Sequence, residues 1–386
     1  MPASSTGPSG KSSKSIAEVF ALCKKRNEEL GDDVVTRLFA SVDANSDGKL
    51  SPAEFDDLLR KLFNVSAIDQ QRMGQLWSST VDTLQRAIDT DESGFIDLAE
   101  FKAAWNGWFG QAAHPVHALV VIDVQNDFID GSLALRQCPA GQDGARVVPV
   151  INAMRRSGRF DEVALSLDWH PQEHCSFLET FAAGKCPVRL HPSQDVAAAA
   201  AAADAPFSTV TLTAPDGTSP MTQVLWPRHC VQGSWGSQLH PGLETGERDF
   251  EVHKGTSPHV DSYSAFYDNS KWRQTSLLAE LRRRGVTHVF CCGLAYDVCV
   301  AFTALHAAEE GFATFVVEDA CCGVTEDGIS AQKAAMRAAG VSIVQSAEVP
   351  SLLSRGSLSQ ALNAATKVRA ARHYRHHHSC HLLIVH

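Results

Sequence analysis

Apolar residues recur along this chain with two different spacings, and the change between them divides the chain. Over residues 16–110 they lie three and four positions apart, the spacing of amphipathic helices, and two acidic segments that each contain a glycine interrupt the pattern. Residues 1–15 are rich in Ser, Gly and Lys and lack the apolar core of a secretory signal. We therefore predict a flexible arm over 1–15 and an all-α domain over 16–112.

Beyond a short hinge predicted at residues 114–117, short β-branched runs alternate with helical segments rich in Ala and Leu. Near-continuous apolar strands between helices are typical of parallel sheets that are buried on both faces. We therefore predict an α/β domain over residues 116–352, with a mostly parallel sheet and helices on both of its faces. The predicted strands are ALVVIDV, EVALSLDWH, DFEVHKG, HVFCCGL, ATFVVEDA and VSIV, and the predicted helices include 273–284 and 298–310.

Two segments have a biased composition. Residues 193–216 contain a run of alanines and are interpreted as a surface insertion with helical propensity. Residues 353–386 end in a His-rich stretch and are interpreted as a helix followed by a loose tail, with adventitious metal binding as the alternative.

The composition narrows the class of protein. With 44% apolar and 20% charged residues among 386, the chain can bury a sizeable core, and no apolar run reaches the length of a membrane span. The net charge of −10 argues against nucleic acid and anionic membranes as partners. Eleven cysteines without a metal-knuckle or secreted-framework spacing favour reduced thiols in the cytoplasm, with the nucleus as the alternative compartment. A homo-oligomer is left open.

The negative charge is concentrated in residues 31–110, which hold 14 Asp and Glu against 7 Lys and Arg. The segments 43–54 and 89–100 each match the twelve-residue EF-hand loop, with oxygen ligands at positions 1, 3 and 5, Gly at position 6, and Glu at position 12. Leu50 and Ile96 are expected to pair in the short ribbon that joins two such loops. The predicted calcium ligands are Asp43, Asn45, Asp47, the Lys49 carbonyl and Glu54, then Asp89, Asp91, Ser93, the Phe95 carbonyl and Glu100.

Residues suited to catalysis lie where predicted strands end. Asp123 and Lys254 each close a strand, and Cys299 lies at the start of the helix that follows another strand. Since the carboxyl ends of parallel strands form one edge, these residues are expected to share a cleft. A helix N-terminus and a neighbouring cation such as Lys254 favour a thiolate, and Asp123 can accept the thiol proton. Taken singly, each residue has an ordinary structural role as its alternative.

A second group near the same edge is suited to a metal. Asp168 and His170 are two apart on a strand, so their side chains project from the same face. With His229 as a third ligand they could hold zinc in an open site. For His174, four positions after His170, a contact with the metal and a position beside its ligands are both open.

Five stretches resemble nicotinamidases of the isochorismatase-like hydrolase family. They are VIDVQNDF, LDWHPQEHCSF, LWPRHCVQGSWGSQL, HKG followed by SYSAF, and GLAYDVCV. The resemblance covers roughly residues 116–350 in the order of the family, whose animal-type members also carry an EF-hand pair in front. Two features depart from it: an unusually wide separation of His170 from His229, and the C-terminal tail.

The resemblance implies a catalytic mechanism and a set of residues. It implies hydrolysis of nicotinamide, with pyrazinamide as a further substrate, and a role in NAD salvage. Another isochorismatase-like amidohydrolase, or a calcium-binding scaffold with an inactive hydrolase domain, are the alternatives. Residue by residue, it assigns Asp123, Lys254 and Cys299 as the catalytic triad, Asp168, His170 and His229 as zinc ligands, the N–H groups of Ala295 and Cys299 beside a cis peptide as the oxyanion hole, and Phe128 and Trp226 as the substrate-binding aromatic walls.

Overall fold

The computed structural model describes residues 32–63, 74–110, 115–157, 160–353 and Ala365. The chain divides into two compact units, one of Met1–Pro115 with Arg355–His386 and the other of Val116–Ser354. The predicted arm, and all but the first residue and Ala365 of the predicted tail, lie outside the described residues. Within the described part of the chain, no helix is long and apolar enough to cross a membrane.

The first unit contains two helix–loop–helix segments whose loops pair through a short ribbon. Leu50 faces Ile96 in this antiparallel ribbon, as predicted. A capping box begins the helix after each loop, formed by Ser51 with Glu54 and by Asp97 with Glu100. The elements are α2 (Asp32–Ala40), β1 (Lys49–Leu50), α3 (Pro52–Leu62), α5 (Gln75–Ile88), β2 (Ile96–Asp97), α6 (Leu98–Ala104) and a π-helical turn (Trp105–Phe109).

Apolar faces of these helices form a core rich in aromatic side chains. Phe101 contacts Phe39, Trp105 and Phe109, with ring centroids 5.6–6.3 Å apart. Ala365, from the C-terminal part of the chain, is fully buried in the same core. This unit is thus completed by a residue more than 250 positions away from its helices.

The second unit is built on a six-stranded sheet in which every strand pair is parallel. The two central strands are buried at every position, which explains their continuous apolar sequences. The α/β class predicted from the sequence is therefore confirmed. The strand order is β10 (Ser342–Val344), β9 (Ala313–Cys322), β8 (His288–Leu294), β3 (His117–Ile122), β4 (Glu162–Asp168) and β7 (Phe250–Lys254).

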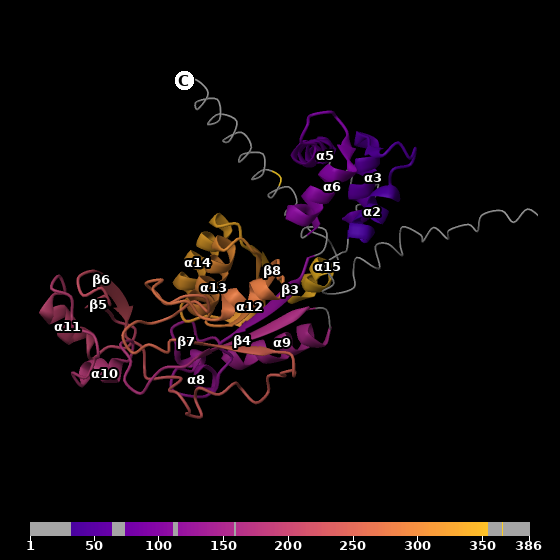
Figure 1. Cartoon of the computed structure of the whole chain (residues 1–386). Helices are drawn as coiled ribbons and strands as arrows, with labels where there is room; N and C mark the ends of the chain where they lie inside the picture. Colours follow the sequence, from indigo (N-terminus) through magenta and orange to yellow (C-terminus); the bar gives the residue numbers. More distant parts are fainter. Residues whose placement is uncertain (1–31, 64–73, 111–114, 158–159, 354–364, 366–386) are drawn as a thin grey trace, which may run out of the picture. The chain divides into compact units, whose positions relative to one another are not determined.

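Helices connect and cover these strands (Figure 1). Helices α9 and α13 make the most extensive contacts with the sheet, chiefly through β8 and β9. The helices are α8 (Asn126–Ile129), α9 (Val147–Arg156), α10 (Leu178–Ala182), α11 (Val196–Ala202), α12 (Leu277–Arg283), α13 (Ala301–Glu309), α14 (Glu326–Ala338) and α15 (Val349–Leu353), with 3₁₀ turns at Leu135–Gln137, Gly144–Arg146 and Ser346–Glu348 and a π-helical turn at Tyr296–Val300.

Several predicted boundaries are wrong. The predicted hinge includes His117, but the first strand already begins there because His117 pairs with His288 of β8. The helix predicted over 273–284 begins only at Leu277, since Gln274 is bridged to Tyr267. The Ala-rich insertion is helical only in α11; it continues into β5 (Thr209–Thr213), which pairs with β6 (Pro220–Val224) in a separate small sheet.

Candidate active site

The carboxyl ends of four adjacent strands bring the predicted catalytic residues together. Asp123 directly follows β3, and Asp168 and Lys254 are register partners at the ends of β4 and β7. Cys299 lies in the π-helical turn that follows β8. Because parallel strands end at one edge of the sheet, residues separated by more than a hundred positions in sequence become neighbours here.

The ammonium of Lys254 lies at the centre of this cluster. The side chain is completely buried, and Nζ lies 2.9 Å from Asp123 Oδ2 and 2.5 Å from Asp168 Oδ1. It donates hydrogen bonds to Cys299 Sγ at 3.3 Å and to the Ser262 carbonyl at 2.9 Å. A buried charge requires such compensation. One ammonium therefore fixes the thiol relative to both carboxylates.

Asp123 keeps one oxygen available beside the thiol. Its Oδ1 accepts a hydrogen bond from Ser166 Oγ at 2.6 Å. Among the described residues, no donor has hydrogen-bond geometry to its Oδ2, although Lys254 is close enough for an ion pair. Asp123, Asp168 and Cys299 each present an atom within 4.8 Å of the others. The arrangement suits transfer of a proton between the thiol and Asp123.

The electrostatics of the cluster favour the neutral thiol. Burial raises the pKa of Cys299 well above its usual range; Lys254 opposes this, but the negative charges of Asp123 and Asp168 add to it. Burial also raises the pKa of Asp123, against the effect of Lys254. The sequence-based expectation of a stabilised thiolate is therefore not supported in this cluster, because burial and two carboxylates outweigh a single ammonium. Nucleophile formation requires proton transfer to a base.

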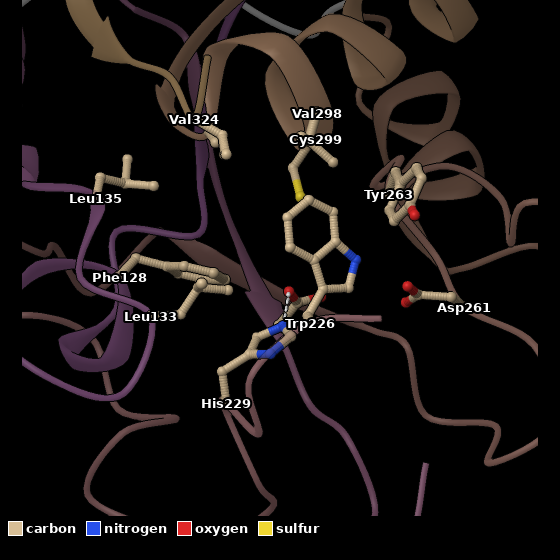
Figure 2. A pocket seen from close by; sticks show the side chains of 12 residues that line it. Phe128, Leu133, Leu135, Trp226, His229, Asp261, Tyr263, Val298, Cys299 and Val324 are labelled. Atoms are coloured by element: carbon tan, nitrogen blue, oxygen red, sulfur yellow. Dashed lines mark ion pairs between the residues drawn. The ribbon is translucent and has the colours of Figure 1, made fainter. Parts of the chain in front are cut away.

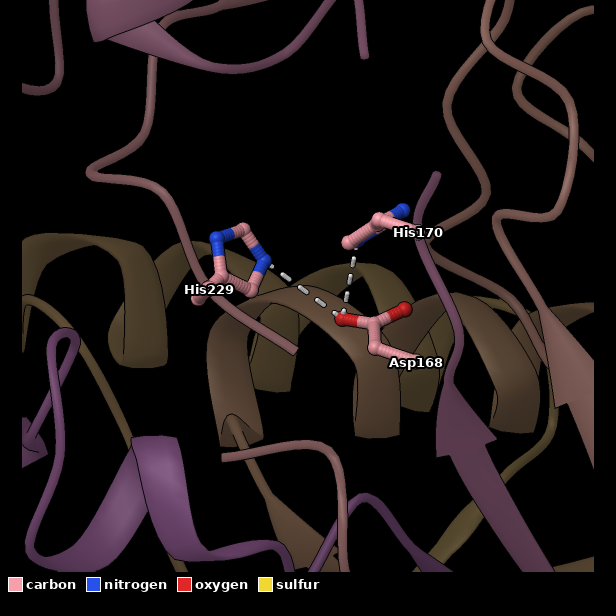
Figure 3. A group of neighbouring side chains, drawn as sticks. All are labelled: Asp168, His170 and His229. Carbon is pink, nitrogen blue, oxygen red and sulfur yellow. Dashed lines mark ion pairs between the residues drawn. The ribbon is translucent and has the colours of Figure 1, made fainter. Parts of the chain in front are cut away.

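In contrast to Asp123, Asp168 has a lowered pKa. Its second oxygen points at two histidines (Figure 3). Although burial opposes ionisation, Lys254 and His170 hold the pKa of Asp168 well below its usual range. Its Oδ2 lies 3.5 Å from His170 Nε2 and 3.6 Å from His229 Nε2. All three side chains are buried.

The other ring nitrogen of each histidine is held by a backbone carbonyl. His170 Nδ1 lies 3.0 Å from the Gly255 oxygen, and His229 Nδ1 lies 2.7 Å from the Pro227 oxygen. In a neutral ring, a hydrogen bond from Nδ1–H leaves Nε2 unprotonated, which is the usual arrangement for metal-binding histidines. The residues present therefore fit a zinc ion bound by one carboxylate and two imidazoles, with a further position open.

His174 lies beside this group and is not part of it. It forms a separate trio with His170 and Asp261. Its Nδ1 contacts Ser176 Oγ at 2.7 Å, and its Nε2 has no partner among the described residues. Burial, with a contribution from His170, lowers the pKa of His174 to about 3, so this ring is neutral at physiological pH. Its contact with His170 is between rings, with centroids 4.3 Å apart.

A pocket is lined by the thiol of Cys299 and by two of the three candidate metal ligands, Asp168 and His229 (Figure 2). It encloses about 380 Å³ including its mouth, near the lower end of the range for small-molecule sites. Phe128 and Trp226, the predicted aromatic walls, line it together with Cys299 and Ala295, and the Leu294–Ala295 peptide bond is cis. The lining residues that sequence reasoning missed are Leu133, Leu135, Asp261, Tyr263, Val298 and Val324.

One signal for two of the missed residues was present in the sequence. Asp261 and Tyr263 flank the first residue of SYSAF, a stretch that resembles the family but to which no role was assigned. Nothing in their spacing shows that a loop carries them to the pocket. Val324 follows the end of β9 and could have been proposed by the same strand-end reasoning that found Asp123.

In the first unit, the two acidic loops have the geometry of cation-binding loops. Gly48 and Gly94, at position 6 of each loop, have φ of 81° and 82°, values that L side chains rarely adopt. Asp89, Asp91 and Glu100 each place an oxygen within 4.8 Å of the others. The other predicted ligands, Asp43, Asn45, Asp47, Lys49, Glu54, Ser93 and Phe95, lie in the same two loops.

Backbone N–H groups already organise the loop carboxylates. Asp43 accepts hydrogen bonds from the N–H groups of Asp47 at 3.2 Å and Gly48 at 3.0 Å. Glu54 accepts one from the N–H of Ala44 at 2.8 Å, so it links the two ends of its loop. Hydrogen bonds, chiefly from Ser51, lower the pKa of Glu54, which keeps this half-buried carboxylate ionised.

Comparisons with known proteins agree with both parts of this description. A family model of the isochorismatase domain matches residues 175–348, and a model of the EF-hand domain pair matches residues 32–105. The nicotinamidase of Acinetobacter baylyi is 36% identical over 235 residues, which cover 60% of this chain and 94% of that protein. The nicotinamidase of Escherichia coli is 35% identical over 54% of this chain and 84% of its own length. A solved nicotinamidase/pyrazinamidase structure from Acinetobacter baumannii is 36% identical with a TM-score of 0.49, covering 61% of this chain and 98% of that one.

Proposed function

The chain belongs to the nicotinamidases of the isochorismatase-like hydrolases, and from that premise we propose that it hydrolyses nicotinamide to nicotinate and ammonia in NAD salvage. The observation that carries the proposal is the position of Lys254, whose Nζ contacts Asp123, Asp168 and Cys299 at once. A thiol, a base and a fixed cation facing a small pocket constitute the machinery of covalent amide hydrolysis.

In the first half of the reaction, Asp123 accepts the proton of Cys299 as the sulfur attacks the carboxamide carbon of the substrate. The C–S bond forms and the carbonyl oxygen becomes an oxyanion, to which the N–H groups of Ala295 and Cys299 would donate. The tetrahedral intermediate then collapses, the C–N bond breaks, and Asp123 returns the proton to the departing ammonia. Burial raises the pKa of Asp123 from its ordinary value, which favours a carboxyl group that both accepts and returns a proton.

In the second half, water attacks the thioester that links the substrate to Cys299. Asp123 again accepts a proton, the C–S bond breaks, and nicotinate leaves with the thiol restored. Throughout, Lys254 would keep the sulfur and the two carboxylates in register. Its own pKa is raised well above normal: burial acts against this, but the two neighbouring carboxylates outweigh it, so the ammonium stays charged.

Asp168, His170 and His229 would hold the zinc ion. Bound there, zinc would supply a Lewis-acid site for the pyridine nitrogen of the substrate, which is chiefly a positioning role. The pocket matches a flat aromatic amide, since Phe128 and Trp226 line it together with Cys299. Pyrazinamide, a second aromatic amide of the same size, is the further expected substrate.

The EF-hand unit would bind two calcium ions, one in each loop. Support comes from the match to the EF-hand pair family and from the loop geometry at Gly48 and Gly94. The acidic loop residues 43–54 and 89–100 would otherwise repel one another, so calcium is expected to stabilise this unit by mass action.

The decisive assay is ammonia release from nicotinamide by the full chain, with pyrazinamide, a ureido compound and isochorismate compared at equal concentration. We expect turnover of nicotinamide and pyrazinamide. Preference for the ureido compound or isochorismate would support the alternative of another isochorismatase-like hydrolase. A folded, zinc-loaded chain that turns over none of the four would support the alternative of a calcium-binding scaffold and refute the proposal.

A further inference from the structure

Asp127, a buried carboxylate that the mechanism does not use, directly precedes the pocket residue Phe128. It belongs to α8 and is 9% exposed. Among the described residues, no Lys, Arg or His forms an ion pair with Asp127. Hydrogen bonds must therefore compensate for the burial of this carboxylate. A buried carboxylate is costly unless hydrogen bonds satisfy it, and its contacts therefore show what it holds in place.

Two backbone N–H groups from different loops donate to this carboxylate. The N–H of Cys230 donates to Asp127 Oδ2 at 2.7 Å, and the N–H of Ser132 donates to Oδ1 at 3.1 Å. The main chain of Asp127 adds two more bonds, to the carbonyl of Gly236 and from the N–H of Leu133. Hydrogen bonds to an ionised acceptor are the strong ones, and this side chain thus joins α8 to the loop of residues 229–236.

Two glycines make room for the carboxylate. A Cβ at Gly131 would lie 2.1 Å from Asp127 Oδ1, and a Cβ at Gly236 would lie 1.9 Å from Oδ2. Neither glycine needs a positive φ, so close approach to Asp127 is the reason for a residue without a side chain at each place. The carboxylate therefore occupies a fitted position between the two segments.

The hydrogen bond between Cys230 and Asp127 affects the two histidines of the candidate metal site, His170 and His229. Cys230 follows His229 and has φ of 46°, a conformation that residues with a side chain rarely adopt and that surrounding contacts must hold. Its carbonyl accepts the N–H of His170 at 3.0 Å. One chain of contacts therefore runs from Asp127 through Cys230 to both His229 and His170. On the other side, the ring of Phe128 lies 5.4 Å from the ring of His229.

We propose that Asp127 is the positioning residue that holds His229 in metal-binding geometry and keeps it in register with the pocket wall Phe128. This rests on the proposed function, because it assigns how this chain prepares its zinc ligands. Loss of the carboxylate should release the left-handed turn at Cys230, so that the imidazole of His229 swings and the metal is held less tightly. Positioning contacts of this kind typically change metal affinity by about 10- to 100-fold.

The test is Asp127→Asn in the full chain, with calcium present to fill the acidic loops. The amide keeps the size but replaces one acceptor with a donor that faces an N–H. Zinc affinity, measured by competition with a chromophoric chelator, should weaken by about 10- to 100-fold. KM for nicotinamide should rise, kcat at saturating zinc should change by less than about threefold, and added zinc should restore most of the activity. If Asp127 only stabilised the fold, added zinc would not restore the activity of the variant.

Asp130→Asn is the matched control, since Asp130 lies three residues away and is exposed, paired with Arg136. It should leave zinc affinity unchanged. Gly131→Ala is the second variant, because it displaces the carboxylate without removing it, and it decides the question if Asp127→Asn does not fold. It too should weaken zinc binding.

The outcomes separate the two proposals. Wild-type zinc affinity in folded Asp127→Asn overturns the inference, and so does lost activity that zinc does not restore. A wild-type chain that binds zinc no better than His229→Ala would instead refute the zinc site of the proposed function, and this inference with it. Weaker zinc binding in Asp127→Asn and Gly131→Ala, with Asp130→Asn unaffected, supports it.

Discussion

The two units of this chain assemble their candidate sites in opposite ways. Each acidic loop would draw its calcium ligands from twelve consecutive residues, 43–54 and 89–100, and would use carbonyl oxygens and several similar carboxylates. The hydrolase site draws single, dissimilar residues from four strand ends, with Lys254 contacting three of them. In the loops, ligands share one task and partly compensate for one another. In the hydrolase site, Asp123, Lys254 and Cys299 would each have a task that no neighbour duplicates.

The sharpest test of that difference is Cys299→Ala. Since no second thiol among the described residues contacts Lys254, turnover of nicotinamide should fall by more than about 10³-fold. Binding of nicotinamide should persist, because the pocket walls remain. Cys186→Ala, which removes a thiol in the cluster around the insertion, is the control and should retain normal turnover. Substantial residual turnover in a folded Cys299→Ala chain would exclude covalent catalysis by this residue.

A second test removes the metal-type group and leaves the triad. The double variant Asp168→Ala, His229→Ala should hold no zinc in the hydrolase unit and lose most of its activity, whereas the wild type should hold one equivalent. Metal analysis after dialysis, with calcium present to fill the acidic loops, measures this. His191→Ala, which removes a half-buried histidine next to the Ala-rich insertion, should bind zinc as the wild type does. Full zinc occupancy in the double variant would show that the ion binds elsewhere.

At the edge of the sheet where the strands begin, opposite the hydrolase site, residues should affect the stability of the unit but not its catalysis. His288 is buried against His117, with ring centroids 5.0 Å apart, and burial together with this neighbour lowers the pKa of His288 to about 3. The unfolded chain takes up this proton as pH falls below about 6.5, but the folded chain does not until near pH 3. Stability is therefore lost progressively between these values, by at most about 2 kcal/mol at pH 5 from this group.

Calorimetry of the full chain at pH 7.5 and pH 5 tests this difference. For His288→Phe, the transition of the hydrolase unit, identified by its shift with added nicotinamide, should fall less between the two pH values than in the wild type. A few degrees of difference is expected for a domain of this size. His253→Phe is the control, because His253 is an exposed position of β7 and should not change the pH dependence of melting. If melting depended equally on pH in the wild type and in His288→Phe, this would contradict a lowered pKa of His288 in the folded chain.

The same contrast explains what could be predicted from the sequence. The acidic loops and the pairing of Leu50 with Ile96 follow from contiguous spacing alone. The strand end that carries Asp123 follows from an apolar run that stops at this polar residue, whereas the strand that carries Lys254 alternates apolar and polar residues. Tyr263 was missed because it lies in a loop, where no periodicity relates sequence position to the pocket.

The pKa shifts of the site residues were harder to predict than the positions of these residues in the fold. The attraction of Lys254 for a thiolate at Cys299 was recognised, but burial and the carboxylates of Asp123 and Asp168 act against it and prevail. Their balance depends on distances of a few ångströms that no spacing in the sequence encodes. The left-handed backbone at Cys230 was also beyond prediction, since it occurs where the N–H of Cys230 makes a tertiary contact with Asp127.

The smallest expected effect is that of calcium on catalysis. Ions at the two loops should stabilise the EF-hand unit, because they neutralise clustered carboxylates such as those of Asp89, Asp91 and Glu100. A change in turnover additionally requires that calcium favour one of two arrangements that differ in activity. The contacts of the candidate hydrolase site described above all lie within the unit of residues 116–354. We therefore predict a structural role, with turnover at constant zinc changing by less than about twofold (under about 0.4 kcal/mol) across a calcium titration.

Glu54→Gln with Glu100→Gln is the matched variant, which should lose calcium-dependent stabilisation and keep the wild-type rate. A several-fold calcium effect on the wild type that disappears in this variant would show that the two kinds of site are coupled.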